Sequence, residues 1–325
     1  MKRITAALLG AAIGLTWAGG ISGASAADLM PVKAPVLAPT MPLDVHGFAE
    51  YDLASTRVTG GGMLLYGRGT VNQTSTGLSL DLYKNPAGFV NGVSVFGGIW
   101  NETWNTPPAG GRAWQEMDWW LGFNVKFAQR WTFSAQMLQF DFPGGATDYN
   151  YVFGLALDDA GLGLPFALNP YVNMFYNAAG PSTVILGKNG GTYRFDLGIA
   201  PSFDMSKSWG VPITFTIPAW VTLGPTDYWN RQDGTTNFCG PTTSGVCSDS
   251  NVGYFATGLK TKYSLASLIP SRLGNWYLKA DAIYYHFVAD SLLATQTPTL
   301  LNVNTSYPNA ERDVGVFTVG TGFTF

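Results

Sequence analysis

The sequence is poor in charge, in histidine and in cysteine, and after its first 26 residues it contains no long hydrophobic run. Charged residues make up 12% of the 325 residues, and only two histidines and two cysteines occur. One pair of cysteines supplies neither a zinc ligand set nor a CxxC redox motif, so no metal or other cofactor is expected. Without about 20 consecutive apolar residues, the chain beyond residue 26 has no expected membrane helix.

The first 26 residues have the pattern of a secretory signal peptide. Lys2 and Arg3 precede an apolar segment at 4–17, and the small residues at 24–26 fit a cleavage site. A membrane anchor is the alternative, but several glycines interrupt the run before it is long enough to span. Removing 1–26 leaves 16 basic and 21 acidic residues, which is not the charge balance of a nucleic-acid-binding protein.

The rest of the chain divides into a leader and one domain. Residues 27–44 carry four prolines and predict an extended periplasmic leader. From 45 to 325, apolar residues recur mainly at a spacing of two, which predicts strands. A chain that crosses a membrane without helices satisfies its backbone only in a closed barrel. We therefore expect an all-β protein, a transmembrane antiparallel β-barrel of about twelve strands with a polar lumen.

The links between the expected strands alternate in length. The longest of them are 55–74, 224–251 and 290–311, whereas others, such as 128–130 and 159–164, are short. Short turns at one rim and long loops at the other are typical of outer-membrane barrels, and an even strand count leaves both termini in the periplasm. The expected strands are 45–54, 75–84, 91–104, 114–127, 131–142, 149–158, 165–178, 192–204, 211–223, 252–267, 275–289 and 312–325.

The last strand, 312–325, has one apolar face and one face of small or polar residues. A soluble sandwich would show the same alternation, with the apolar face in its core. The signal peptide and the terminal Phe325 favour the membrane barrel. Phe325 resembles the final residue of Gram-negative outer-membrane barrels, where it is the insertion signal. That resemblance implies the barrel-insertion machinery and outer-membrane lipid as partners, and the cell outer membrane as the location.

Three short motifs between residues 45 and 160 occur in a recognisable order. They are Phe96-Gly97-Gly98-Ile99-Trp100, Glu116-x-Asp118 with Gly122 four residues on, and Phe140-Asp141-Phe142-Pro143-Gly144. Their order resembles that of the TorF-like porins. The chain departs from the family near its first strand, because the first arginine after Tyr51 is Arg57 and valine follows it. The resemblance implies a small channel.

Charges at the expected inward positions change sign along the chain. If acidic and basic walls face each other, the field between them would orient polar solutes in a modest bore. The alternative is that these groups pair across a plugged lumen, and Asp196 and Asp281 among the bases indicate local pairing. Burying many charges without water is costly, however. The expected pore-lining residues are Glu50, Asp52, Asp81, Glu102, Glu116, Asp118, Arg194, Lys260, Lys262 and Lys279.

The remaining reactive side chains give little support to catalysis. Cys239 and Cys247 are close together in the longest expected loop, and in an exported chain this spacing favours a local disulfide. His286 with Ser291 resembles the arrangement of outer-membrane phospholipases, which use a Ser and a His on the outer wall. The sequence supplies neither an orienting residue nor oxyanion donors for them, so no enzyme is expected.

We therefore expect a porin-like outer-membrane channel for passive diffusion of small polar solutes. The alternative is a non-conducting barrel whose loops bind a partner or surface ligand, with 224–251 as the contact. The sequence leaves open whether a loop folds into the lumen.

Overall fold

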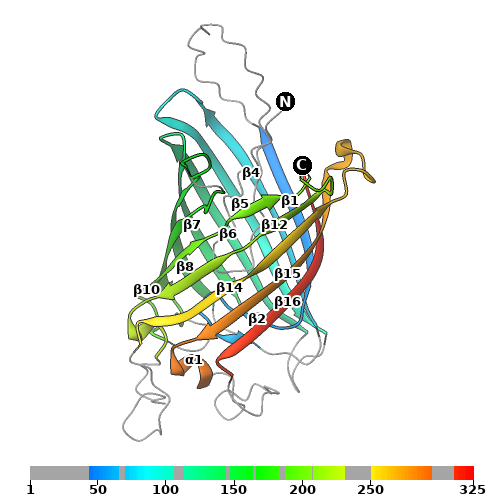
Figure 1. Cartoon of the computed structure of the whole chain (residues 1–325). Helices are drawn as coiled ribbons and strands as arrows, with labels where there is room; N and C mark the ends of the chain where they lie inside the picture. Colours follow the sequence, from blue (N-terminus) through cyan, green and yellow to red (C-terminus); the bar gives the residue numbers. More distant parts are fainter. Residues whose placement is uncertain are drawn as a thin grey trace, which may run out of the picture.

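The computed structural model describes residues 44–65, 70–105, 113–143, 147–163, 166–182, 187–206, 208–230, 250–294 and 311–325. The expected signal peptide, most of the Pro-rich leader, and both Cys239 and Cys247 lie outside these residues. The described chain forms a closed antiparallel barrel of twelve strands, as predicted (Figure 1).

Ten wall strands are continuous, and the other two are each divided into two pieces. The continuous strands are β1 (Val45–Ala54), β4 (Val71–Lys84), β5 (Val90–Trp104), β6 (Trp114–Phe127), β7 (Trp131–Asp141), β8 (Thr147–Leu157), β9 (Tyr171–Ala179), β14 (Val252–Ser264), β15 (Asn275–Phe287) and β16 (Asp313–Thr324). The divided strands are β10 (Thr192–Ile199) with β11 (Ser202–Asp204), and β12 (Ile213–Thr216) with β13 (Ala219–Leu223).

The ring closes between its first and last strands. β1 pairs with β16 in a register that places Phe48 opposite Thr324 and Ala54 opposite Thr318. Beyond the end of β16, Phe325 and Gly47 exchange two backbone hydrogen bonds of 3.0 and 3.1 Å. Phe325 therefore belongs to the ladder that joins the first and last strands of the barrel.

Two prolines divide neighbouring wall strands at the same level. Pro201 lies between β10 and β11, and Pro218 lies between β12 and β13. Neither can donate to a ladder, so continuous pairing is interrupted there. The gap is bridged by the amide of Ile217, which donates to the carbonyl of Pro201 at 2.9 Å. Pro201 and Pro218 therefore produce one break that two neighbouring strands share.

Loop lengths differ between the two rims, as predicted. The terminal rim, where β1 begins and β16 ends, carries tight turns such as 128–130, and the opposite rim, called the loop rim, carries the longest links. One expected turn was wrong, because the link after β8 extends over 158–170 and not 159–164. The Asp159 carboxylate accepts backbone hydrogen bonds at 3.1 and 2.8 Å from Leu168 and Asn169, which holds this segment out of the ladder.

The two faces of the wall are inverted relative to a soluble protein. Large apolar side chains point outward and are exposed, including Leu121, Phe123, Phe317 and Val319. The polar phase points inward and is buried, and the fully buried Asp118 is one of its members. An apolar outer band around a polar interior is the arrangement that lipid favours. The short helices are η1 (Thr226–Tyr228), η2 (Ser271–Leu273) and α1 (Asp290–Ala294), and none in the described segments could span a membrane.

The face assignment predicts opposite responses to arginine on the two sides of the wall. Val319 is outward and 56% exposed, so Val319→Arg is expected to cost about 2 to 4 kcal/mol in a bilayer if the site is near the midplane. Ser75 is inward and opposite Glu50 in the ladder, so Ser75→Arg is expected to cost less. Urea unfolding in lipid vesicles measures both, and equal costs would contradict the assignment.

Candidate functional site

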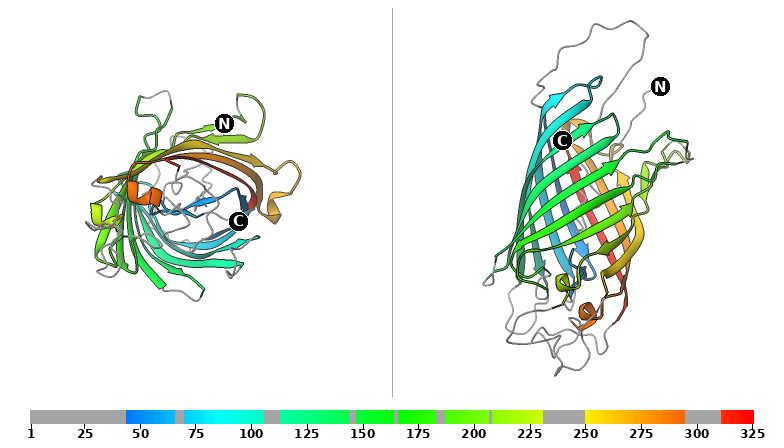
Figure 2. Two further views of the ribbon diagram at one scale, coloured as in Figure 1. Left: turned by 90° about the horizontal axis from the view of Figure 1, so that it is seen from below. Right: turned by 90° about the vertical axis from the view of Figure 1, so that its left-hand side faces the viewer.

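A hairpin from the first long link folds into the barrel. Its strands β2 (Arg57–Val58) and β3 (Leu64–Leu65) pair with each other, and β2 lies inside the ring in a view along the axis (Figure 2). The amide of Thr59 donates to the carbonyl of Met63 at 2.8 Å, and the turn places Gly62 at a φ of 87°. Glycine adopts this conformation readily, so Gly62 suits the turn.

One side of the hairpin is apolar and packs on the wall. Val58 and Leu64 belong to a buried cluster that includes Tyr254 and Tyr285 from β14 and β15. Tyr254 also donates its hydroxyl to the carbonyl of Gly60 at 3.2 Å. These contacts fill the lumen next to β14 and β15 near the loop rim. The opposite side of the hairpin faces strands β6 to β10 across a cavity.

The polar side of the hairpin is anchored by Arg57. Its guanidinium forms ion pairs with Glu116 and with Glu102, the latter at 3.2 Å, and lies 4.4 Å from the ring centre of Trp100. Glu102 accepts a further hydrogen bond of 3.0 Å from Gln73. Burial alone would lower the pKa of Arg57, but these carboxylates outweigh it and hold the pKa above its ordinary range. The hairpin is thus joined to the wall by a charge that stays ionised.

A second buried guanidinium lies across from Arg57. Arg194 on β10 pairs with Asp196 on the same strand, donates to the hydroxyl of Tyr228 at 2.9 Å and lies over the ring of Phe175 at 3.6 Å. Asp196 also accepts a hydrogen bond of 2.9 Å from Thr222. Burial raises the pKa of Tyr228, so its hydroxyl stays protonated. The predicted local pairing of Asp196 is therefore present.

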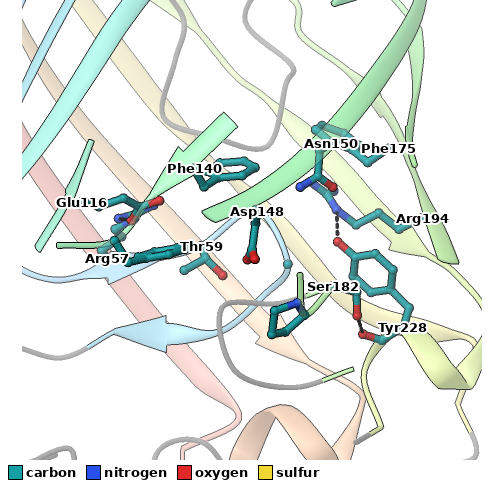
Figure 3. Close-up of a pocket in the computed structure, with 14 residues that line it drawn as sticks. Arg57, Thr59, Glu116, Phe140, Asp148, Asn150, Phe175, Ser182, Arg194 and Tyr228 are labelled. Atoms are coloured by element: carbon teal, nitrogen blue, oxygen red, sulfur yellow. Dashed lines mark hydrogen bonds and ion pairs between the residues drawn. The ribbon is translucent and has the colours of Figure 1, made fainter. Parts of the chain in front are cut away.

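Between the two guanidiniums lies a cavity with about 50 Å³ open to the centres of water molecules, enough for several waters (Figure 3). Asp148 lies near the middle of the residues drawn, beside Phe140. The hairpin supplies one side and strands β6 to β10 supply much of the other. The lining residues are Arg57, Thr59, Gly60, Gly61, Glu116, Phe140, Phe142, Asp148, Asn150, Phe175, Pro181, Ser182, Arg194 and Tyr228. We call this constriction the eyelet.

Nearer the terminal rim, Lys279 on β15 forms ion pairs with two carboxylates on β1. Its ammonium lies 2.9 Å from Glu50 and 2.7 Å from Asp52. The expected separation of these charges into facing walls was wrong, because barrel closure leaves only β16 between β1 and β15. Gly320 is the β16 residue between Asp52 and Lys279, and a Cβ there would overlap the Asp52 carboxylate. The small face of the last strand therefore makes room for the ion pairs.

The other expected pore-lining residues are in different environments. Asp81 lies 3.2 Å from Lys84 and 3.5 Å from His46, near the terminal rim. Asp118 is fully buried, and neither of its carboxylate oxygens has a hydrogen-bond partner among the described residues. Lys262 lies 3.8 Å from the ring centre of Tyr277. Lys260 is half-buried and has no ion pair within the described ranges.

The histidine and serine considered for catalysis do not form a site together. His286 is exposed on the outer wall, with Nδ1 2.7 Å from Asp313, an orienting residue that the sequence pattern did not reveal. The hydroxyl of Ser291 is buried and has no hydrogen-bond partner in the described part of the chain. The same part contains no group of three His, Cys, Asp or Glu residues able to hold a metal ion.

Three residues central to the eyelet were absent from the expected lining. Arg57 and Tyr228 are in links expected to be outside the barrel. Asp148 was expected in a short link, but it belongs to β8. A signal for the hairpin was available, because Val58, Met63 and Leu64 are unusually apolar for an exposed loop. No comparable signal marks Asp148 or Tyr228.

Comparison with known proteins gives resemblance at the level of architecture. No family model matches the sequence, and no curated protein matches it. The chain is similar to the crystal structure of the NanC porin, with 11% identity, 85% of this chain and 98% of that chain covered, and a TM-score of 0.41. The β domain of the Bordetella autotransporter BrkA is 10% identical, with 86% of this chain and 99% of that chain covered and a TM-score of 0.33. OccAB1 of Acinetobacter baumannii is 9% identical, with 86% of this chain and 96% of that chain covered and a TM-score of 0.29. Likeness at this level assigns no residue a role.

The ion pairs over β16 predict that Gly320 is intolerant of a side chain. Gly320→Val should displace the Asp52 carboxylate and crowd the carbonyl of Tyr51, lowering the free energy of unfolding by about 2 kcal/mol or more. Gly315→Val is the matched control, because a Cβ at this outward position meets only Phe317, at 3.5 Å. Thermal unfolding followed by gel mobility compares them, and equal stability would contradict the proposed role of Gly320.

Proposed function

We propose that the protein is an outer-membrane channel for passive diffusion of small polar solutes, and that the eyelet is its narrowest part. The observation that carries the proposal is the hairpin held inside a charged lumen by Arg57, with a cavity between it and strands β6 to β10. Charged and polar residues at a constriction admit solutes that can exchange hydration for protein contacts. A core built only for stability would bury charge at unnecessary cost.

The proposed orientation follows from the rims. The loop rim would face outside and the terminal rim the periplasm, as in other outer-membrane barrels. Phe325, paired with Gly47 at the closing seam, would be the signal read by the barrel-insertion machinery. Outer-membrane lipid would cover the apolar outer band that includes Phe317 and Val319.

Deleting the hairpin tests the eyelet. Ala54 and Val71 are partners in the ladder, so an Asn-Gly turn replacing residues 55–70 can connect β1 to β4 without moving either strand. In planar bilayers, the intact protein should conduct and the deletion variant should show a conductance several-fold higher, because the obstruction is gone. Equal conductance would mean that the hairpin does not limit flow. No conductance from either protein would favour the barrel that binds through its loops.

The two half-buried lysines of β14 predict the charge dependence of the channel. Lys260→Glu with Lys262→Glu replaces two positive charges by two negative ones, while leaving Lys279 in its ion pairs. Preference for cations should rise, and the rise should shrink near 1 M salt, where the Debye length falls to about 3 Å. Reversal potentials under a salt gradient measure this.

The control for that experiment is Lys188→Glu on the loop rim, where the side chain is exposed. It replaces one positive charge by one negative charge, which is half the change of the β14 pair. Per charge replaced, it should shift the reversal potential much less. An equal shift per charge from Lys188→Glu, or none from the β14 pair, would show that Lys260 and Lys262 do not line the conducting path.

A further inference from the structure

Buried carboxylates outnumber buried guanidiniums around the eyelet. The buried cations there are Arg57 and Arg194, and the buried carboxylates are Glu102, Glu116, Asp118, Asp148 and Asp196. Both guanidiniums are already engaged by carboxylates and by aromatic rings. Among the residues that the structure describes, an entering anion would meet an excess of carboxylates and no disengaged guanidinium, so these residues disfavour anions.

Asp148 is the carboxylate of the cavity that lacks compensation. It is only 4% exposed, and it forms no hydrogen bond or ion pair with another described residue. The charged group that acts on it, Glu116, is another carboxylate and repels it. A buried carboxylate is costly unless a partner neutralises it. Because Asp148 lines the cavity, a cation in the cavity can neutralise it.

The surroundings of Asp148 are built closely around it. Phe140 is its partner in the β7–β8 ladder, and Phe142 also lines the cavity. Gly180 lies against the carboxylate, where any Cβ would overlap it, and its φ of 82° suits glycine. Asn150, on the same inward face of β8, adds an amide oxygen that can accept a hydrogen bond.

These groups fit an organic ammonium better than a bare metal ion. Hard divalent cations require six to eight oxygen ligands, or near-ideal octahedral coordination, and the described residues contain no metal-binding group. An alkylammonium needs one carboxylate, a further acceptor and an aromatic face, which Asp148, Asn150 and Phe140 supply.

We propose that the eyelet binds small organic cations carrying a primary ammonium group, with Asp148 as the counter-ion. The inference rests on the proposed channel function and names the class of solute that the channel selects. The ammonium donates to Asp148 and Asn150, its alkyl part contacts Phe140, and the solute passes one molecule at a time.

The test uses ethylammonium as a blocker of potassium current through the full-length protein in planar bilayers. Ethylammonium should reduce the current at millimolar concentration. Asp148→Asn should raise the half-blocking concentration about tenfold or more, because a charge-assisted hydrogen bond is lost. Asp158→Asn is the matched control at the terminal rim, and its half-blocking concentration should be unchanged. Acetate should not block.

The outcomes separate this inference from the channel itself. The inference would be overturned if ethylammonium does not reduce the potassium current, or if it reduces the current equally in the unmutated protein and in Asp148→Asn. Either result would leave the channel proposal intact. If the unmutated protein carries no potassium current, the channel proposal fails. Calorimetric titration of the purified protein with ethylammonium then tests the binding site alone. Binding heat that is lost in Asp148→Asn would support the site, and absence of heat in the unmutated protein would overturn it. Phe140→Leu keeps the carboxylate and should weaken binding or block by a smaller factor than Asp148→Asn.

Discussion

The constraint on which the structure depends is that a chain surrounded by lipid must satisfy its backbone hydrogen bonds internally. Strands achieve this only if the ladder closes, and here it closes through β1 and β16 with Phe325 included. Closure then fixes the alternation of side chains, because every strand must turn one phase outward and the other to the lumen. The charges that this places inside must in turn find partners or water.

Much of the wall follows from the sequence because a period of two is a local property. The apolar phase of 114–127 and of 312–325 predicts the outward faces of β6 and β16. Leu121 and Phe123 on the first, and Phe317 and Val319 on the second, are exposed in the structure. Local patterns fail where a side chain overrides them, as Asp159 does by binding two backbone amides. They also cannot tell which strands become neighbours, so Lys279 and Glu50 were expected on facing walls.

The interior of the loop-rim half could not be predicted in the same way. Its shape depends on contacts between residues far apart in sequence, such as Arg57 with Glu116 and Tyr254 with Gly60. Neither contact has a periodic signal. The hairpin has both an apolar side and a charged side, so it packs on the β14–β15 wall while its arginine neutralises carboxylates on β5 and β6. One segment therefore determines both the packing and the charge of the eyelet.

The ion pairs of Lys279 have a consequence for folding. Lys279 and Glu50 are 229 residues apart, and the strand between them in the wall is the last one in the chain. These contacts therefore cannot form in a partly assembled sheet, and the loop-closure entropy must be overcome before they contribute any stability. An open sheet lacking β16 would carry unpaired carboxylates at one edge and an unpaired ammonium near the other. Ring closure is therefore expected to be cooperative and slow, with neutralisation of these charges as its final step.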